Sequence, residues 1–376
     1  MKDTALRFSY IGNQGRNLEQ RYDLNNKEGW YNYVIRTGEA RPGNTDLLRP
    51  NPDWAMKAIN KTGNSNTHMA EINLERRFSK GVAFQTYYTF SRALTTTDDD
   101  AGAGGSQDIN GDPRGFSVPQ SNEILGEPNL TYAQRQRLGY ANNPSIPQHR
   151  VSWNGVLDLP FGRGRHFGGN MSKLLDAVVG GWSLTPAGSW RSGLWLTVGE
   201  SGNGETLWQF GDPTLSADER LTMNINGVNQ RIWFKGSFDP TQATNVDMQK
   251  LQQLMPVDPT QRVMRQLGNP GDGGWVQLPL KNGGTAWAPL DATYYYNLVS
   301  WNQRANIKGP GYWTADMGLN KTFSIRESTK LQIKADAFNF LNHPNDVNPN
   351  MYTGLQDLSM QANEPRIFQF SARLSF

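Results

Sequence analysis

The stretch that decides the fold is IFQFSARLSF, residues 367–376. Its side chains alternate between two kinds. The apolar set is Phe368, Phe370, Ala372, Leu374 and Phe376, and the polar set is Gln369, Ser371, Arg373 and Ser375. Strict alternation is typical of a β-strand with one apolar and one polar face. Because a charge stands on the polar face, that face must meet water, and the pattern predicts a wall with lipid outside and a wet interior.

The same period of two recurs upstream. The segment Val82–Ser91 places Phe84, Tyr88 and Phe90 on one face, and His68–Phe78 alternates in the same way. Between them lies Ser79-Lys80-Gly81, in which glycine can adopt a positive φ. The two segments therefore predict a hairpin of long antiparallel strands.

Further strands are expected at residues 4–12, 151–159, 182–190, 314–323 and 331–337, with a poorer one near 54–60. Residues 324–329 form a second short turn in this interpretation. We count about nine membrane strands in total, whereas bacterial single-chain barrels use even numbers.

The connections between these strands are of two lengths. Short turns contrast with long loops at about 95–147 and 199–310. Outer-membrane barrels show this asymmetry, with short periplasmic turns and long extracellular loops. We predict a small helix at 172–179 and another in the second long loop. For the second helix we expect Thr244 or Asn245 as the cap, and Met248, Leu251 and Met255 on one side.

The composition agrees with such a wall. Apolar residues make up 36% of the chain, yet aromatic residues reach 11%. Mean hydropathy is −0.65. No apolar run reaches the roughly 20 residues that a membrane helix needs. The predicted fold class is therefore all-β: an antiparallel transmembrane β-barrel, present in part, with long extracellular loops and short periplasmic turns. The predicted location is the cell outer membrane.

Five segments in order resemble TonB-dependent receptors of the Oar-like type. They are NLERRFSKG (73–81), GGWSL (180–184), GPGYW (309–313), DAFNFLNHPN (336–345) and the run from Pro365 to Phe376. The resemblance spans most of the chain and is loosest in the two long loops. It implies a receptor barrel segment that takes part in substrate capture and uptake across the outer membrane.

The resemblance also implies parts that are not in this sequence. They are an N-terminal plug domain, a TonB box and a regulatory module. A secretory signal, with its basic start and apolar core, is not seen either. We therefore expect residues 1–376 to be the C-terminal part of a larger barrel. The TonB complex would act on it only through the missing plug. Other expected partners are outer-membrane lipid, the barrel assembly machinery and an unknown small ligand.

Two sets of residues are candidates for specific roles. Aromatic side chains in the long loops could stack on a ligand; these are Trp195, Trp208, Trp233, Trp275, Trp287 and Tyr295. The alternative for them is packing within the loops. The end of the chain resembles the signal read by the barrel assembly machinery; its residues are Phe368, Phe370, Leu374 and Phe376.

Evidence for other chemistry is weak. Asp108, Asn110 and Asp112 imitate the start of a calcium loop, but Pro113 and Pro119 stand where such a loop needs glycine and glutamate. The four histidines have no metal-ligand spacing, and no nucleophile elbow or phosphate loop occurs. We predict no enzyme activity, no cofactor and no metal. With a net charge of +3 and no basic run, we expect no nucleic-acid partner either.

Two other functions remain open from the sequence. One is a complete, smaller porin-like channel, which an even number of strands and a pairing of the first with the last would favour. The other is a secreted carbohydrate-binding β-protein, which would be soluble without detergent.

Overall fold

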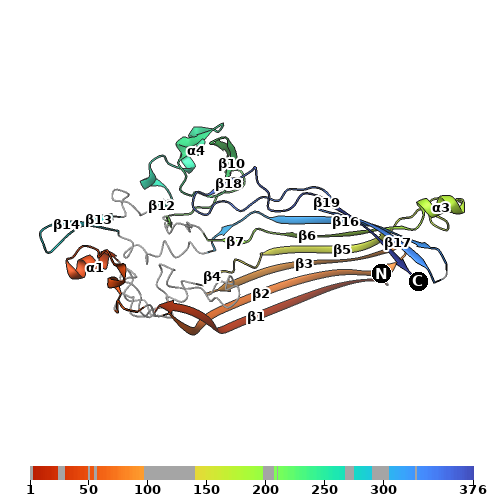
Figure 1. Cartoon of the computed structure of the whole chain (residues 1–376), viewed down its shortest axis with the longest axis horizontal. Coiled ribbons are helices and arrows are strands. Elements are labelled where there is room, and N and C mark those ends of the chain that lie inside the picture. Colours follow the sequence, from red (N-terminus) through yellow and green to blue (C-terminus); the bar gives the residue numbers. More distant parts are fainter. Residues whose placement is uncertain are drawn as a thin grey trace.

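The computed structural model describes residues 3–23, 30–49, 51–54, 57–96, 140–197, 207–209, 211–266, 275–289, 305–326 and 328–376. Its main feature is one long, curved antiparallel sheet (Figure 1). Its strands are β1 (Thr4–Asp23), β2 (Lys57–Ser79), β3 (Val82–Thr95), β4 (Ala141–Asn142), β5 (His149–Asp158), β6 (Trp182–Arg191), β16 (Tyr312–Ser324), β17 (Lys330–Phe338) and β19 (Ile367–Ser375).

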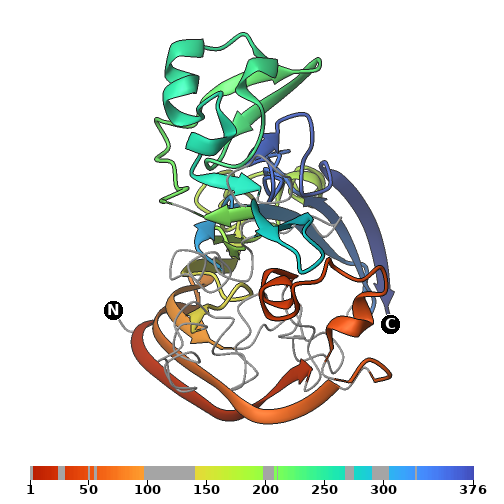
Figure 2. The same ribbon diagram turned by 90° about the vertical axis from the view of Figure 1, so that its left-hand side faces the viewer.

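The sheet follows the order of the chain. Its path is β1-β2-β3-β5-β6-β16-β17-β19, with the short β4 attached to β3. Seen from one end, the wall curves around an open side, with the N- and C-terminal strands on either side of the gap (Figure 2). Among the described residues, β1 and β19 are the two edges of this path and do not pair with each other.

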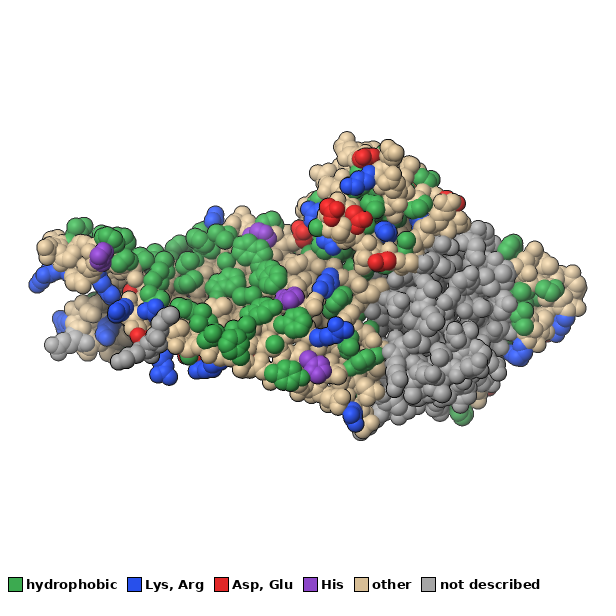
Figure 3. Space-filling model, turned by 180° about the vertical axis from the view of Figure 1, so that it is seen from behind, with side chains coloured by type: hydrophobic (Ala, Val, Ile, Leu, Met, Phe, Trp, Pro, Cys, Tyr) green, Lys and Arg blue, Asp and Glu red, His purple; other side chains and the backbone are tan. Residues whose placement is uncertain are grey.

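The register separates the two faces as the sequence predicts. Along one row, Leu6 pairs with Leu74, Leu74 with Thr86, and Thr86 with Trp153. The neighbouring row on the opposite face contains Arg7, Asn73 and Tyr87. The convex outside carries a broad hydrophobic band (Figure 3). An apolar outer face and a polar inner face are what a wall between lipid and water requires.

One part of the strand count is wrong. Residues 57–79 form the single strand β2, so the poorer strand near 54–60 is its first part. The path therefore contains eight long strands in the described part of the chain. β1 likewise continues to Asp23, well past the expected end at Gly12. The alternation fades there because these ends extend beyond the lipid, where neither face needs apolar side chains.

The short connections are confirmed. At the β2–β3 turn, Lys80 and Gly81 have φ values of 54° and 81°. Two consecutive positive φ values are the signature of the tight hairpin turn that matches the twist of the strands. β16 and β17 are joined by a second short turn. The helix α3 (Lys173–Val179) begins after Ser172, whose side chain accepts a hydrogen bond from the Leu175 N–H.

At the opposite end, part of the second long loop folds into a small domain. Its sheet has the order β11 (Ala243–Thr244), β9 (Thr222–Ile225), β10 (Val228–Ile232) and β18 (Leu355–Asp357). The helix α4 (Met248–Leu254) covers it. The core contains Leu215, Met223, Ile225, Ile232, Phe238, Ala243, Leu251, Met255 and Leu355. We call residues 211–266 together with β18 the surface domain.

Two expectations for this loop need correction. The cap of α4 is Asp247, not Thr244 or Asn245. Asn245 has a φ of 56°, which is incompatible with the extended backbone of a helix cap. Met248, Leu251 and Met255 lie on one side, as predicted: Leu251 and Met255 are buried in the core, and Met248 packs against it. The participation of β18 was not foreseen, because it comes from the later loop between β17 and β19.

Smaller elements complete the loops. They are α1 (Trp30–Thr37), the 3₁₀ turns Thr45–Leu48, Pro240–Gln242 and Pro259–Gln261, and the strands β7 (Trp195–Leu196), β8 (Leu207–Gln209), β12 (Met264–Gln266), β13 (Trp275–Pro279), β14 (Thr285–Pro289) and β15 (Ile307–Lys308). The hairpin β13–β14 packs against α1 through Leu278 and Val34. Within the described ranges, no helix is both long and apolar enough to span a bilayer.

Candidate functional site

A pocket lies where the surface domain joins the wall. It has a volume of about 320 Å³. From the surface domain it receives Thr214, Leu215, Arg220 and Trp233; from the end of the wall it receives Trp195, Asn306, Ile307 and Lys308. We call it the loop pocket. It brings together residues that are more than 100 positions apart in the chain, because β7 pairs with β15 directly beneath the surface domain.

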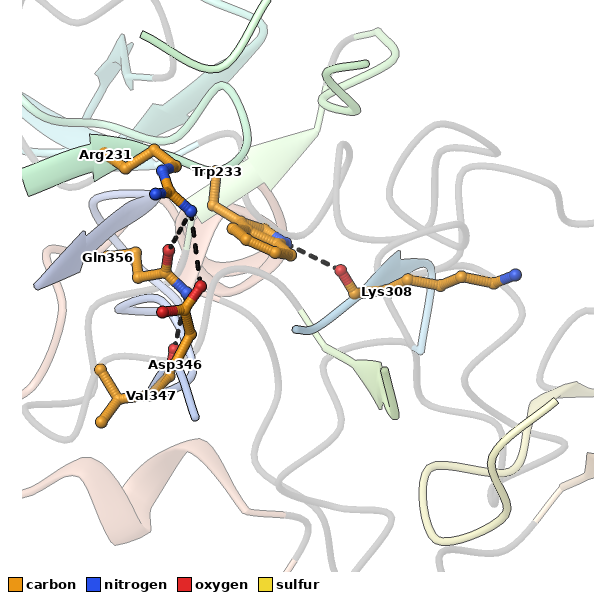
Figure 4. A network of polar contacts seen from close by, with 6 residues as sticks. All are labelled: Arg231, Trp233, Lys308, Asp346, Val347 and Gln356. Carbon is orange, nitrogen blue, oxygen red and sulfur yellow. Dashed lines mark hydrogen bonds and ion pairs between the residues drawn. The ribbon is translucent and has the colours of Figure 1, made fainter. Parts of the chain in front are cut away.

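Two cations and two indoles dominate the loop pocket. The guanidinium carbon of Arg220 lies 3.7 Å from the centroid of the Trp233 ring. The Lys308 ammonium lies 5.0 Å from the centroid of Trp195. The Trp233 Nε1–H donates to the Lys308 carbonyl at 2.8 Å, which fixes the orientation of that indole (Figure 4). The arrangement is two cation–π pairs that share one cavity.

The side chains that line the loop pocket carry a net positive charge. The Lys308 ammonium donates to the amide oxygen of Gln148. In the described part of the chain, neither Lys308 nor Arg220 forms an ion pair with a carboxylate, and the buried Arg220 Nε has no hydrogen-bond acceptor. Burial lowers the pKa of Arg220, and the nearby Arg231 lowers that pKa further. An arginine nevertheless keeps its proton. An anionic group is therefore the complement of this site.

A second network joins the surface domain to the loop after β17. Arg231 donates to Asp346 Oδ2 and to Gln356 Oε1, both at 3.4 Å. Gln356 in turn donates to the Val347 carbonyl at 2.8 Å (Figure 4). Gln356 is completely buried, so these bonds satisfy a polar group that would otherwise be costly to bury. They hold two separate loops as one unit.

The segment that follows β17 is anchored to the wall by asparagines. Asn339, with a φ of 47°, ends the strand, and its N–H donates to Asp316 Oδ1 at 2.8 Å. The His343 N–H donates to Asn339 Oδ1 at 3.0 Å. Asn345 then hydrogen-bonds the backbone of Trp313 through its side-chain amide. This explains why the DAFNFLNHPN segment needs asparagine at these positions.

The inner face of the wall forms a second, larger cavity of about 490 Å³. Its polar lining residues are Glu75, Arg76, Gln85, Asn154, Thr185, Asp316, Lys334 and Asp336. Two of the acids are paired: Arg7 lies 3.1 Å from Glu75, and Lys334 lies 2.9 Å from Asp336. The inner face is thus wet and nearly balanced in charge, which suits polar contents.

A family model described as an outer membrane beta barrel domain matches residues 1–369. The chain belongs to this outer membrane β-barrel family. Its place is therefore the cell outer membrane, as predicted, and the predicted fold class is confirmed for a wall that the described strands do not close.

Two solved structures are similar to this β-barrel chain. One is the outer membrane transporter YddB from Escherichia coli, with 10% identity and a TM-score of 0.43; the match covers 100% of this chain and 31% of that chain. The other is P. aeruginosa FpvA bound to heterologous pyoverdines, with 11% identity, a TM-score of 0.33, and coverage of 99% and 24%. The chain thus spans less than a third of either length. No curated protein matches it.

In the structure of this β-barrel, the six aromatic residues predicted to contact a ligand lie in different places. Trp195 and Trp233 both reach the loop pocket. Trp275 and Trp287 belong to the hairpin β13–β14, where Trp287 is 43% exposed. Trp208 lies in β8, paired with Arg265 of β12. Tyr295 is outside the described residues. Trp233 is only 7% exposed and packs with Phe234, Met264 and Ile307, so much of its surface serves the core of the loops.

Three residues of the predicted assembly signal lie on the edge strand β19, and Phe376 follows it directly. The four apolar side chains of the signal are exposed outward: Phe368 by 56%, Phe370 by 76%, Leu374 by 55% and Phe376 by 96%. They continue the apolar outer face, since Phe370 pairs with Ala335 and Leu374 with Leu331. This geometry leaves them available to lipid or to another protein. Their recognition by the assembly machinery stays a prediction.

The calcium candidates Asp108, Asn110 and Asp112 lie outside the described residues. In the part of the chain that the structure describes, no group of three or more His, Asp or Glu side chains is placed to hold a metal ion. The residues that the sequence left unnoticed are Arg220 and Lys308. Only the fold could reveal them, because each is a single cation in a polar loop.

Proposed function

We propose that this chain forms part of the barrel of a TonB-dependent receptor of the Oar-like type, and that it takes part in substrate capture and uptake. The five resembling segments support this assignment. The observation that carries it is the loop pocket, a cavity with two cations and two indoles above the wet inner face of the wall. A simple pore needs no folded domain or defined pocket over its mouth.

The chemistry of the pocket favours an organic anion with a flat face. Arg220 and Lys308 supply positive charge without a competing carboxylate among the described residues, and Trp195 supplies a ring for stacking. A sugar acid or an aromatic acid combines both properties. The protein would hold such a ligand at the mouth before transport.

Transport itself would require the plug. The polar inner face can hold a plug domain by hydrogen bonds, with Glu75, Lys334 and Asp336 among its lining groups. The TonB complex would act through that plug. Outer-membrane lipid would cover the apolar outside, and the assembly machinery would read the strand that ends in Phe376. We propose no catalytic or cofactor role for the wall.

A conductance measurement separates the receptor from the porin-like alternative. The full-length protein, inserted in planar bilayers, should give no steady open-channel current, because the plug fills the lumen. Urea, which loosens a plug before it unfolds a barrel, should then open a current reversibly. A large steady current without urea would favour the porin. Among the described residues, the eight long strands of the path agree with the even number of a porin, but β1 and β19 do not pair.

A further inference from the structure

The connection between β5 and β6 carries apolar side chains that are exposed and not covered by the described part of the chain. We call residues 159–180, which include α3, the foot. None of the residues of α3 is buried. Leu174 is 84% exposed, Val178 is 68% exposed, and Leu175 is also exposed. Phe161 and Phe167, whose ring centroids are 5.6 Å apart, add two half-exposed rings. A surface helix normally buries its apolar side against the protein.

Two residues of the wall fix where the foot stands. The Lys321 ammonium donates to the carbonyls of Ala177, Val178 and Gly180, at 2.6, 3.1 and 2.6 Å. The Trp182 Nε1–H also donates to the Val178 carbonyl, at 2.8 Å. These carbonyls are at the C-terminal end of α3, where a cation is favoured by the helix dipole. We call Lys321 and Trp182, with these four hydrogen bonds, the clamp; its Lys321 is buried, with 4% of the residue exposed.

The clamp lies on the lipid side of the wall. Lys321 pairs with Trp182, two positions from Leu319 and Leu184, which pair with each other on the apolar outer face. The foot is therefore attached to the outside of the barrel at its short-turn end. Figure 3 shows hydrophobic surface continuing from the wall toward this end, with Lys and Arg side chains beside it. Arg163 and Lys173 of the foot are both exposed.

We propose that the foot is a lipid anchor, with the apolar side of α3 inserted among the acyl chains of the periplasmic leaflet and its basic residues at the phospholipid headgroups. The occupant is bilayer lipid, because the apolar surface is continuous with the lipid-covered wall. Amphipathic helices with apolar and basic sides bind membranes in this way. The anchor fixes the height of the wall in the membrane and is independent of what the receptor transports.

The proposal can be tested with single cysteines, because the chain has none. An environment-sensitive fluorophore is placed at L174C in the foot, at F370C on the lipid-facing wall and at S328C on the exposed β16–β17 turn. The full-length protein is reconstituted in vesicles of phosphatidylethanolamine and phosphatidylglycerol. Quenching by doxyl-labelled lipid is compared with quenching by iodide in water.

We expect the label at L174C to behave like that at F370C, with iodide quenching reduced about threefold or more relative to S328C. Iodide quenching equal to that at S328C would show that the foot lies in water and would overturn the proposal. Protection from both quenchers would also overturn it, since protein would then be the occupant.

The clamp offers an internal control. K321M should release the foot and lower doxyl quenching at L174C by about half or more, whereas K321R should retain it because the cation remains. Barrel folding is checked by heat-modifiable migration on gels. Unchanged doxyl quenching in folded K321M would mean that the clamp does not position the foot.

Discussion

The side-chain amide of Asn345 hydrogen-bonds both backbone groups of Trp313, accepting from its N–H at 2.9 Å and donating to its carbonyl at 2.8 Å. The pairing of β16 with β17 ends at Met317. Asn345 therefore takes the place of a neighbouring strand just beyond that point. Its own N–H donates to Asn363 Oδ1 at 2.6 Å. One buried side chain thus ties the last loop to the wall.

Removing this amide should loosen the top of β16. N345A removes both partners of the half-buried Trp313 N–H and carbonyl, at a cost of about 1–3 kcal/mol. Hydrogen exchange at the Trp313 amide should accelerate by about tenfold or more. The exposed Asn229 provides the control, because N229A should not change that rate. An unaltered Trp313 amide in N345A would contradict this role.

Gly188 of β6 pairs with Trp153 of the neighbouring strand β5, and the Trp153 indole lies over Gly188. A Cβ at this position would lie 2.4 Å from Trp153 Cζ2 and 2.5 Å from the Thr314 carbonyl oxygen. G188L should therefore displace the indole and destabilise the wall by about 1–3 kcal/mol. Folding yield into vesicles should fall. Gly43 is the matched site, because a Cβ there would have no heavy atom within 4 Å beyond its chain neighbours, and G43L should fold normally.

Arg262 should be essential to the surface domain. Its Nε and two Nη groups donate to the carbonyls of Pro256, Ser237 and Val257, at 2.8, 3.1 and 2.9 Å. Arg262 is buried, and R262L removes its three hydrogen bonds to partly buried carbonyls, which should cost about 1–3 kcal/mol. Limited proteolysis should then cut within the surface domain, while the barrel keeps its heat-modifiable migration. R262K should be intermediate, and wild-type protease resistance in R262L would refute the prediction.

Acid should weaken the surface domain before the wall. The Thr241 hydroxyl and N–H donate to Asp239 and lower its pKa below the ordinary 3.8; Thr214 acts likewise on Asp212. A lowered folded pKa adds stability that is present above the ordinary value and is lost as the pH falls through the folded value. Protease resistance should stay constant down to pH ~5 and decline below pH ~4. D239N should show a smaller decline.

The loop pocket should discriminate by charge. We expect R220Q to weaken the binding of an acidic oligosaccharide, such as oligogalacturonate, by about tenfold, which is about 1.4 kcal/mol. A neutral oligosaccharide of the same length should bind equally to both proteins, because stacking on Trp195 needs no cation. Calorimetry on the full-length protein measures both. An equal loss of affinity for the two ligands would indicate collapse of the pocket. Unchanged affinity for both would show that Arg220 does not take part in binding.

The wall was predictable because each of its faces meets one solvent throughout. Residues 82–91 alternate strictly for this reason, and the structure has them in β3. The outer ends of β1 and β2 lie beyond the lipid, so no alternation marks them. The hydrogen bonds of Lys321 could not be predicted from the sequence either. A lysine on the apolar face breaks the alternation, and only the fold shows that the carbonyls of α3 are its partners.

The surface domain was only partly predictable. Its helix was expected from Leu251 and Met255, but its sheet depends on β18, far along the chain. One local signal was available and was missed: Asp-Pro-Thr occurs at 212–214, 239–241 and 258–260. In each case the carboxylate accepts from the N–H and the hydroxyl of the threonine. Such hydrogen-bonded turns are typical of a folded loop, and they help to explain why segment 211–266 of the second long loop is folded.

The pairing of β10 with β18 also sets an order in time. Arg231 and Gln356 are 125 residues apart, and β16 and β17 are made between them. Segment 211–266 is therefore synthesised and exported before the strand that completes its sheet. Until β18 arrives, the edge of β10 displays unpaired backbone groups, which can recruit a foreign strand. The surface domain can therefore be completed only after β18 has been made and has reached the same side of the wall.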